Sequence, residues 1–247
     1  LHTVRHSFPT RRSSDLDRLE QLAESHKAAF RSVQPYPHAV FDDFLRPESA
    51  RAIADAFPRP GDPLSWEQFG AQGYEVKLGC ADEARFPEPL RRAIHDLNSG
   101  PFLVFLETLT GIPHLLPDPY LIGGGIHLSR QGDHLGIHAD FNWSERLRLH
   151  RRLNVLIYLT TDWQPGYGGE LELWDTTGTR RERVIPPLFN RCAMFATRSD
   201  TFHGHPQPWA GPEGVYRQSI ALYYYTAERP AEEQRAPHNT LYKGYNA

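Results

Sequence analysis

One short motif in the sequence combines two residue types that bind metal ions. His138 and Asp140 are separated by a single alanine, and they form the only His-x-Asp in the 247-residue chain. In an extended strand, residues i and i+2 project to the same face, so one imidazole nitrogen and one carboxylate oxygen can reach the same ion. The chain has 13 histidines, and roughly one such motif is expected by chance. The pair therefore predicts a metal site only if a further ligand lies elsewhere.

Two later histidines could supply that ligand. His203 and His205 flank Gly204, and His203 follows His138 by 65 residues (203 − 138). That separation is long enough for His203 to lie on a later strand of the same barrel. Strand alternation does not separate the two candidates, because both would face the same side. Two histidines and one carboxylate form the facial triad of non-haem Fe(II) sites, which leaves coordination positions open. We therefore predict a metal site made of His138, Asp140 and a distal histidine.

An arginine inside an apolar run is the second unusual feature. Arg217 and Ser219 share one face of the segment 216–226, which is otherwise strongly apolar. A buried guanidinium needs a partner. Its planar fork can bind a carboxylate through two hydrogen bonds, and a serine hydroxyl would add a third donor. The partner is either a carboxylate of the protein itself or an incoming anionic ligand, and the sequence leaves both interpretations open.

The elements that must position these residues change in kind near Tyr120. Upstream, the pattern predicts helices at 17–33, 47–57, 87–98 and 102–110, a strand at 36–45 and a loop at 58–73. Downstream, turns separate short β runs near 120–128, 134–141, 151–161, 168–175, 182–186, 192–198 and 215–226. Helices followed by a block of strands predict an α+β fold in which helices cover one face of a β double layer.

The run 152–160 shows both faces of one predicted strand. One face is purely aliphatic and suits packing under helices: Leu153, Val155, Ile157 and Leu159. The other face is half polar: Asn154, Leu156, Tyr158 and Thr160. A face that mixes polar groups with aliphatic ones suits the ligand-holding interior of a barrel. The alternative is that these polar groups pair with one another.

Composition excludes some classes of protein. With 27 basic and 30 acidic residues, nothing suggests binding to a nucleic-acid backbone. The two cysteines, Cys80 and Cys192, are far apart and lack metal-ligand spacing, which fits a reducing compartment. No apolar run approaches the roughly 18 residues that span a bilayer, and no signal-peptide pattern is present, so we expect a cytoplasmic protein without a membrane partner. The sequence does not predict an oligomeric state.

The loop 142–152 is rich in arginine and should lie near the mouth of the predicted barrel. Its four arginines are Arg146, Arg148, Arg151 and Arg152. We interpret the loop as a solvated charged turn, and contact with an acidic substrate is the alternative.

The first 16 residues stand apart from the rest of the chain. They resemble the conceptual translation of a common sequencing adapter, and the only Met is Met194, so we expect a fragment with a non-native, disordered segment at 1–16. A basic, serine-rich targeting leader is the other interpretation. For 17–247 we expect one domain, with helical support at about 17–115, a jelly-roll core at about 120–226 and a C-terminal tail at 227–247.

In this order, His138-Ala-Asp140, His203-Gly204 and Arg217-Gln-Ser219 resemble the Fe(II)/2-oxoglutarate-dependent dioxygenases, and specifically their prolyl-4-hydroxylase-like branch. The resemblance covers roughly 36–230 and is close from Gly123 to Thr226. It implies a double-stranded β-helix, or jelly roll, with N-terminal helices packed on the major sheet.

The resemblance also implies roles for particular residues. Fe(II) would be held by His138, Asp140 and His203, with His205 as the alternative distal ligand. The far carboxylate of 2-oxoglutarate would be bound by a set that also includes neighbours on the half-polar face: Arg217, Ser219, Tyr158 and Asn154. Dioxygen would be the other cosubstrate, and ascorbate a reductant.

The implied reaction is hydroxylation of an unactivated C–H bond, with release of succinate and CO2. The substrate would be a peptide or a small molecule, such as a prolyl residue or a related compound. Two other classes of protein remain open. A cupin-like, non-oxidative metal enzyme would keep the triad but would not need Arg217 and Ser219. A metal-free jelly-roll binding module would use the histidines as hydrogen-bonded core residues.

Overall fold

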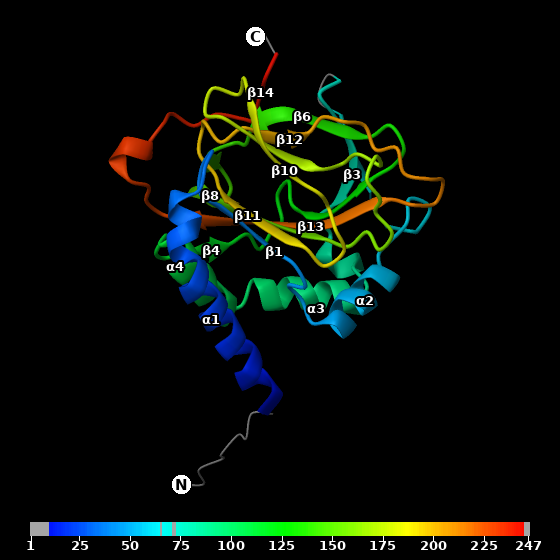
Figure 1. Cartoon of the computed structure of the whole chain (residues 1–247), viewed down its shortest axis with the longest axis horizontal. Helices are drawn as coiled ribbons and strands as arrows, with labels where there is room; N and C mark the ends of the chain where they lie inside the picture. The colour runs from blue at the N-terminus through cyan, green and yellow to red at the C-terminus, as the bar shows by residue number, and fades with distance from the viewer. Residues whose placement is uncertain (1–9, 65, 71–72, 245–247) are drawn as a thin grey trace.

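A curled antiparallel β-sheet dominates the protein, with helices on one side of it (Figure 1). The computed structural model describes residues 10–64, 66–70 and 73–244, with side chains from Asp17 onward. The helices are α1 (Thr10–Ser32), α2 (Pro47–Asp55), α3 (Glu88–Leu97) and α4 (Gly100–Thr110), with short 3-10 turns at Glu83–Arg85 and Ala231–Glu233. The strands are β1 (His38–Phe41), β2 (Glu67–Gly70), β3 (Glu75–Cys80), β4 (Leu116–Pro117), β5 (Gly125–Ser129), β6 (His134–Ala139), β7 (Trp143–Ser144), β8 (Leu149–Tyr158), β9 (Leu171–Trp174), β10 (Arg181–Ile185), β11 (Cys192–Ala196), β12 (His203–His205), β13 (Arg217–Thr226) and β14 (Leu241–Tyr242).

The strand order shows how the sheet folds into two layers. Neighbouring strands follow the order β1-β11-β8-β13-β5-β3-β6-β12-β9-β10. Strand β3 joins the layers, because its Leu78 pairs with Leu128 of β5 and its Glu75 pairs with Leu135 of β6. The predicted double-stranded β-helix is therefore confirmed, and the two layers enclose a space between them.

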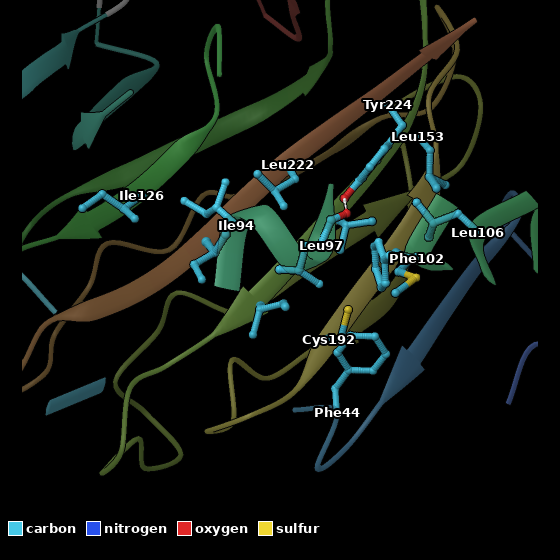
Figure 2. Close-up of a cluster of buried hydrophobic side chains, with 14 of the residues drawn as sticks. Phe44, Ile94, Leu97, Phe102, Leu106, Ile126, Leu153, Cys192, Leu222 and Tyr224 are labelled. Carbon is cyan, nitrogen blue, oxygen red and sulfur yellow. Dashed lines mark hydrogen bonds between the residues drawn. The ribbon is translucent and has the colours of Figure 1, made fainter. Parts of the chain in front are cut away.

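The outer face of the β8 layer packs against the helices, as the sequence predicted. Leu153, Val155 and Ile157 of β8 belong to one buried cluster with Ile94 and Leu106 of the helices. Figure 2 shows this cluster between the sheet and α3 and α4, where the Tyr224 hydroxyl also donates to the Leu97 carbonyl at 2.8 Å. Because the aliphatic face of β8 packs against the helices, Asn154, Leu156 and Tyr158 on its opposite face point towards the other layer.

Two expectations about elements were wrong. The segment expected to be a loop at 58–73 contains β2, which forms a hairpin with β3. Glycine and proline content marked this region as a loop, but backbone pairing with a neighbouring strand overrides such local preference. Residues 10–16, expected to be disordered, continue α1 towards the N-terminus, while residues 1–9 lie outside the described part. No helix in the described part of the chain is long and apolar enough to cross a membrane.

We predict that residues 1–16 contribute little to stability. In the described side chains of α1, packing against the core comes from residues beyond this segment, such as Ala23 and Phe30. A chain that begins at Asp17 should melt within about 2 °C of the full chain, because it keeps the α1 residues that belong to the buried core. Thermal unfolding followed by circular dichroism checks this. A drop of roughly 10 °C would show that the segment belongs to the folded domain.

Candidate metal centre and cavity

Strand pairing brings the three predicted metal ligands together. His203 of β12 and His138 of β6 are direct cross-strand partners, and Asp140 follows the end of β6. Ligand atoms of the three side chains lie within 4.8 Å of one another. The Asp140 carboxylate lies between the two rings, with Oδ1 3.5 Å from His138 Nε2 and Oδ2 3.4 Å from His203 Nε2. All three side chains are buried, so any ion between them would be shielded from bulk water.

Backbone carbonyls orient both imidazoles. Nδ1 of His138 lies 2.8 Å from the Gly136 carbonyl oxygen, and Nδ1 of His203 lies 3.0 Å from that of Thr201. A carbonyl oxygen only accepts, so each Nδ1 must carry the proton and each Nε2 presents a lone pair towards Asp140. Burial lowers the pKa of His203, which favours the neutral, ligating form. Two imidazole lone pairs and one carboxylate fit a divalent transition metal.

Asp140 is held by two further side chains. Arg151 Nη2 lies 3.0 Å from Asp140 Oδ2, and the amide nitrogen of Asn154 donates to the same oxygen at 2.8 Å. Asn154 Oδ1 in turn accepts from Arg151 at 2.8 Å. Burial raises the pKa of Asp140, but Arg151 and the imidazoles outweigh that effect and hold it well below its usual range. Asn154, predicted to lie near the cosubstrate, lines the cavity with Arg217 and also donates to the predicted metal ligand Asp140.

The arginine-rich loop is only partly the solvated turn that the sequence indicated. Arg146 and Arg148 are not buried, but Arg151 is 1% exposed and Arg152 is also buried. The Arg151 guanidinium stacks on the Tyr223 ring at 3.5 Å and on the Phe141 ring at 4.5 Å. The interpretation failed for Arg151 because the ladder between β8 and β13 has a bulge between Tyr224 and Tyr225, which single-strand alternation does not anticipate.

Arg217 lies on the inner face of β13 and is 5% exposed. Its Nε donates to the Gly169 carbonyl at 2.7 Å, and no carboxylate among the described residues forms an ion pair with it. A Cβ at Gly169, whose φ is +73°, would lie 2.7 Å from Arg217 Cδ, so glycine makes room for this side chain. The absence of a carboxylate partner argues against a structural ion pair. Because burying a guanidinium without an anion is unfavourable, the position of Arg217 favours an incoming anion.

Tyr158 supplies a second unsatisfied group beside Arg217. The guanidinium carbon lies 5.1 Å from the Tyr158 ring centre, and the buried Tyr158 hydroxyl has no hydrogen-bond partner in the described part of the protein. Burial raises the pKa of Tyr158 to about 12, so the hydroxyl stays protonated and can donate. Ser219 pairs with Tyr158 across the ladder. Arg217, Tyr158 and Ser219 thus lie near one another, and each carries a hydrogen-bond donor of the kind that binds a carboxylate.

One cavity of about 200 Å³ connects the two groups. Its lining includes the predicted metal ligands His138, Asp140 and His203 and also Arg217 and Ser219. Several further lining residues had no role predicted from the sequence: Phe69, Glu75, Lys77, His127, Tyr223, Thr240 and Tyr242. His205 also lines the cavity, with an unpartnered Nδ1. Those on β2 and β3 were missed because that region was expected to be part of the helical support.

The C-terminal tail closes one side of the metal centre. Strand β14 pairs with β6, with Tyr242 opposite His138, and the two rings are 5.4 Å apart. The Lys243 backbone N–H donates to the Ile137 carbonyl at 2.8 Å. A tyrosine in a polar tail is a weak sequence signal, because nothing in its neighbours shows that it pairs with a strand roughly 100 residues earlier.

Comparison with known proteins agrees with this geometry. The family described as the 2OG-Fe(II) oxygenase superfamily matches residues 124–225. A prolyl hydroxylase from Trichoplax adhaerens, solved with a hypoxia inducible factor peptide fragment, has a TM-score of 0.62 at 15% identity and covers 93% of this chain and 99% of its own. A prolyl-4-hydroxylase from Pseudomonas putida has a TM-score of 0.58 at 14% identity, covering 83% and 98%. A non-haem alpha-ketoglutarate-dependent epimerase of nogalamycin biosynthesis has a TM-score of 0.52 at 16% identity, covering 85% and 84%.

These likenesses to solved structures establish the fold, and no curated protein matches the chain. The fold and the matched residues together define a metal-dependent enzyme built on a double-stranded β-helix. Residues 124–225 match the 2-oxoglutarate–Fe(II) oxygenase superfamily, and the fold is one that prolyl hydroxylases also have. The match indicates a dioxygenase that uses Fe(II), 2-oxoglutarate and dioxygen. The cupin-like and metal-free alternatives are not favoured.

Proposed function

We propose that His138, Asp140 and His203 hold the Fe(II), and that Arg217, Ser219 and Tyr158 bind the far carboxylate of 2-oxoglutarate. The position of the unpaired Arg217 carries this proposal, because it lies in the same cavity as the three metal ligands and has no carboxylate partner among the described residues. With Fe(II) held by the three ligands, 2-oxoglutarate in the same cavity would supply the anion that Arg217 lacks.

The overall reaction joins one oxygen atom of O2 to the substrate C–H carbon and the other to succinate, with loss of CO2. Bound iron supplies the redox chemistry that activates O2. The residues of this chain supply geometry and electrostatics. Arg151 and Asn154 keep the Asp140 carboxylate oriented towards the two imidazoles. The Gly136 and Thr201 carbonyls hold the imidazole protons on Nδ1, so that both Nε2 atoms remain free to ligate.

A direct test is succinate release. The purified protein is incubated with 2-oxoglutarate and O2, with and without Fe(II). Even without a substrate, slow iron-dependent conversion of 2-oxoglutarate to succinate is expected. If 2-oxoglutarate neither binds the iron-loaded protein nor disappears, the proposed assignment of Arg217 and the metal ligands is wrong.

The distal metal ligand can be tested separately from activity. We expect His203→Ala to abolish Fe(II) binding, and His205→Ala to keep most of it. The reason is geometric: His203 is the cross-strand partner of His138, and a ladder irregularity separates His205, which lies opposite Leu135. Metal content measured by mass spectrometry after loading with Fe(II) under nitrogen distinguishes the two. Loss of iron in His205→Ala with retention in His203→Ala would reverse the assignment.

For the substrate we propose a prolyl residue or a related small molecule. The proposal draws support from the Trichoplax adhaerens and Pseudomonas putida neighbours, which are described as prolyl hydroxylases. Ascorbate as a reductant and a cytoplasmic location also remain proposals. They rest on the sequence resemblance and on the two unpaired, buried cysteines, Cys80 and Cys192.

A further inference from the structure

An ion pair lies in the cavity wall, outside the groups already described. Lys77 of β3 is 8% exposed, and its Nζ lies 2.9 Å from Glu75 Oε1. Both side chains line the cavity. A lysine is rarely buried to this extent, and packing alone does not require a charge in this position. The charge of Lys77 therefore points to a ligand in the cavity.

Glu75 is fully engaged by the protein, whereas Lys77 is not. Glu75 Oε1 faces Lys77, and Oε2 accepts from the Tyr242 hydroxyl at 2.8 Å. Lys77 has Glu75 on one side and the Phe69 ring on another, with Nζ 5.2 Å from the ring centre. An ammonium has three N–H donors, and only one carboxylate in the described part of the protein takes one of them. Glu75 and Phe69 thus hold Lys77 at the cavity wall, where its ammonium can donate to a ligand.

A second unsatisfied group lies beside Lys77. His127 Nε2 is buried and has no hydrogen-bond partner among the described residues. His127 pairs with Gly79 of β3 on one side and with Ser219 of β13 on the other. Cross-strand partners face the same side of a sheet, and Lys77 and Arg217 each lie two residues before a partner of His127. Lys77 and Arg217 therefore face the same side, on the two strands that flank β5. They form two distinct positive positions on one wall.

The charge balance of the cavity favours an anionic guest. Its lining carries three cations, Lys77, Arg151 and Arg217, and two carboxylates, Glu75 and Asp140, giving 3 − 2 = +1. Fe(II) adds +2 and 2-oxoglutarate adds −2, so the sum stays at +1 with both bound. A carboxylate of the second substrate would bring it to zero. Charge-assisted hydrogen bonds are also roughly twice as strong as neutral ones, so Lys77 would select a carboxylate over a peptide carbonyl.

We propose that Lys77, held by Glu75, binds a carboxylate of the molecule that is hydroxylated. This inference rests on the proposed function, because it assigns Arg217 to 2-oxoglutarate and leaves Lys77 for the other substrate. Of the two substrates proposed above, a prolyl residue and a related small molecule, this favours the small molecule, in the form of a carboxylic acid of net charge −1 such as an N-acyl amino acid. An internal residue of a polypeptide has no carboxylate at its backbone, so it would leave Lys77 without its partner.

The experiment compares acids with their amides. The protein, loaded with Fe(II) and 2-oxoglutarate, is given a panel of N-acetyl amino acids, each beside its carboxamide, and succinate release is measured. At least one acid should stimulate release roughly tenfold or more beyond its amide. The best acid is then titrated calorimetrically into protein holding Mn(II) and 2-oxoglutarate, where no turnover occurs. If no acid exceeds its amide, or if a proline-containing peptide without a free carboxylate is the better substrate, the proposal is overturned.

Variants of Lys77 test whether this side chain binds the carboxylate of the acid. In Lys77→Met, the Kd for the acid should rise about 10- to 100-fold, while the Kd for 2-oxoglutarate stays within about twofold. The double variant Glu75→Gln/Lys77→Met removes both charges, so it leaves no buried carboxylate unpaired, and it should show the same selective loss. Lys243→Met is the matched control, because Lys243 also lies over an aromatic ring, that of Phe202 at 4.3 Å, but does not line the cavity.

The outcomes separate this inference from the proposed function. If wild-type protein fails to bind 2-oxoglutarate, the proposed function itself has failed. If 2-oxoglutarate binds normally but Lys77→Met binds the acid as well as wild type does, only the Lys77 inference has failed. A loss of 2-oxoglutarate binding in Lys77→Met would mean that Lys77 contacts the cosubstrate, which also overturns the inference.

Discussion

Asp140→Ala is expected to lose Fe(II) and, in addition, several kcal/mol of stability. The carboxylate is the anionic member of the metal-ligand group, and turnover should fall roughly 1000-fold or more, equivalent to about 4 kcal/mol of barrier. The loss of stability follows from Arg151, whose guanidinium is buried and lies 3.0 Å from Asp140 Oδ2. Removing one partner of a buried pair costs about 3–5 kcal/mol, because the other charge is left uncompensated. Iron content and urea unfolding measure the two effects.

Asp140→Asn is the matched control for this variant. Its side-chain oxygen can still accept a hydrogen bond from Arg151, so stability should fall by less than in Asp140→Ala, while the loss of the negative charge still weakens iron binding. A second comparison is Arg151→Met, which removes the cation and leaves the ligand set intact. If Asp140→Ala unfolds at the same urea concentration as wild type, the pairing between Asp140 and Arg151 contributes nothing to the stability of the fold.

The sequence predicted correctly which side chains share a face on single, regular strands. The two faces of β8 could be separated by alternation, because Leu153, Val155 and Ile157 must all pack under helices. The same reasoning placed Arg217 and Ser219 on one face of β13, and the cavity has both of them in its lining. Each of these predictions depended on one strand at a time, for which the period of two is a sufficient guide.

Prediction failed where the answer depends on several strands together. The hydrogen bond from the Asn154 amide to Asp140 was not anticipated, because it joins β8 to the end of β6, and these two strands are not neighbours in the ladder. Arg151 was interpreted as solvated because its neighbours in sequence are charged, whereas a bulge and two aromatic rings bury it. Lys77 and Tyr242 reach the cavity from parts of the chain that seemed peripheral. Long-range pairing of this kind has no local signature.

Arg217 is the residue for which the predicted effects on binding and on stability differ most. If it anchors 2-oxoglutarate, Arg217→Met should raise the Kd for the cosubstrate about 30- to 1000-fold, the equivalent of about 2–4 kcal/mol. Arg217→Lys keeps the charge but not the planar fork, so it should recover only part of that affinity. Titration of iron-loaded protein with 2-oxoglutarate measures both, and Lys243→Met serves as a control that removes a cation away from the cavity.

The melting temperature of Arg217→Met in the absence of 2-oxoglutarate is the deciding measurement. An arginine that stabilises the fold through an ion pair would lower it on removal, by several degrees for each 1–2 kcal/mol or so lost. In this protein the guanidinium is buried and has no carboxylate partner among the described residues, and its backbone hydrogen bond goes to Gly169. Burial lowers the pKa of Arg217, the sign expected for a cation that the folded protein does not fully compensate. Methionine of similar length should therefore leave the melting temperature unchanged or raise it. A collapsed melting temperature with unchanged cosubstrate affinity would make Arg217 a structural residue, and the unpaired charge at this end of the cavity would need another explanation.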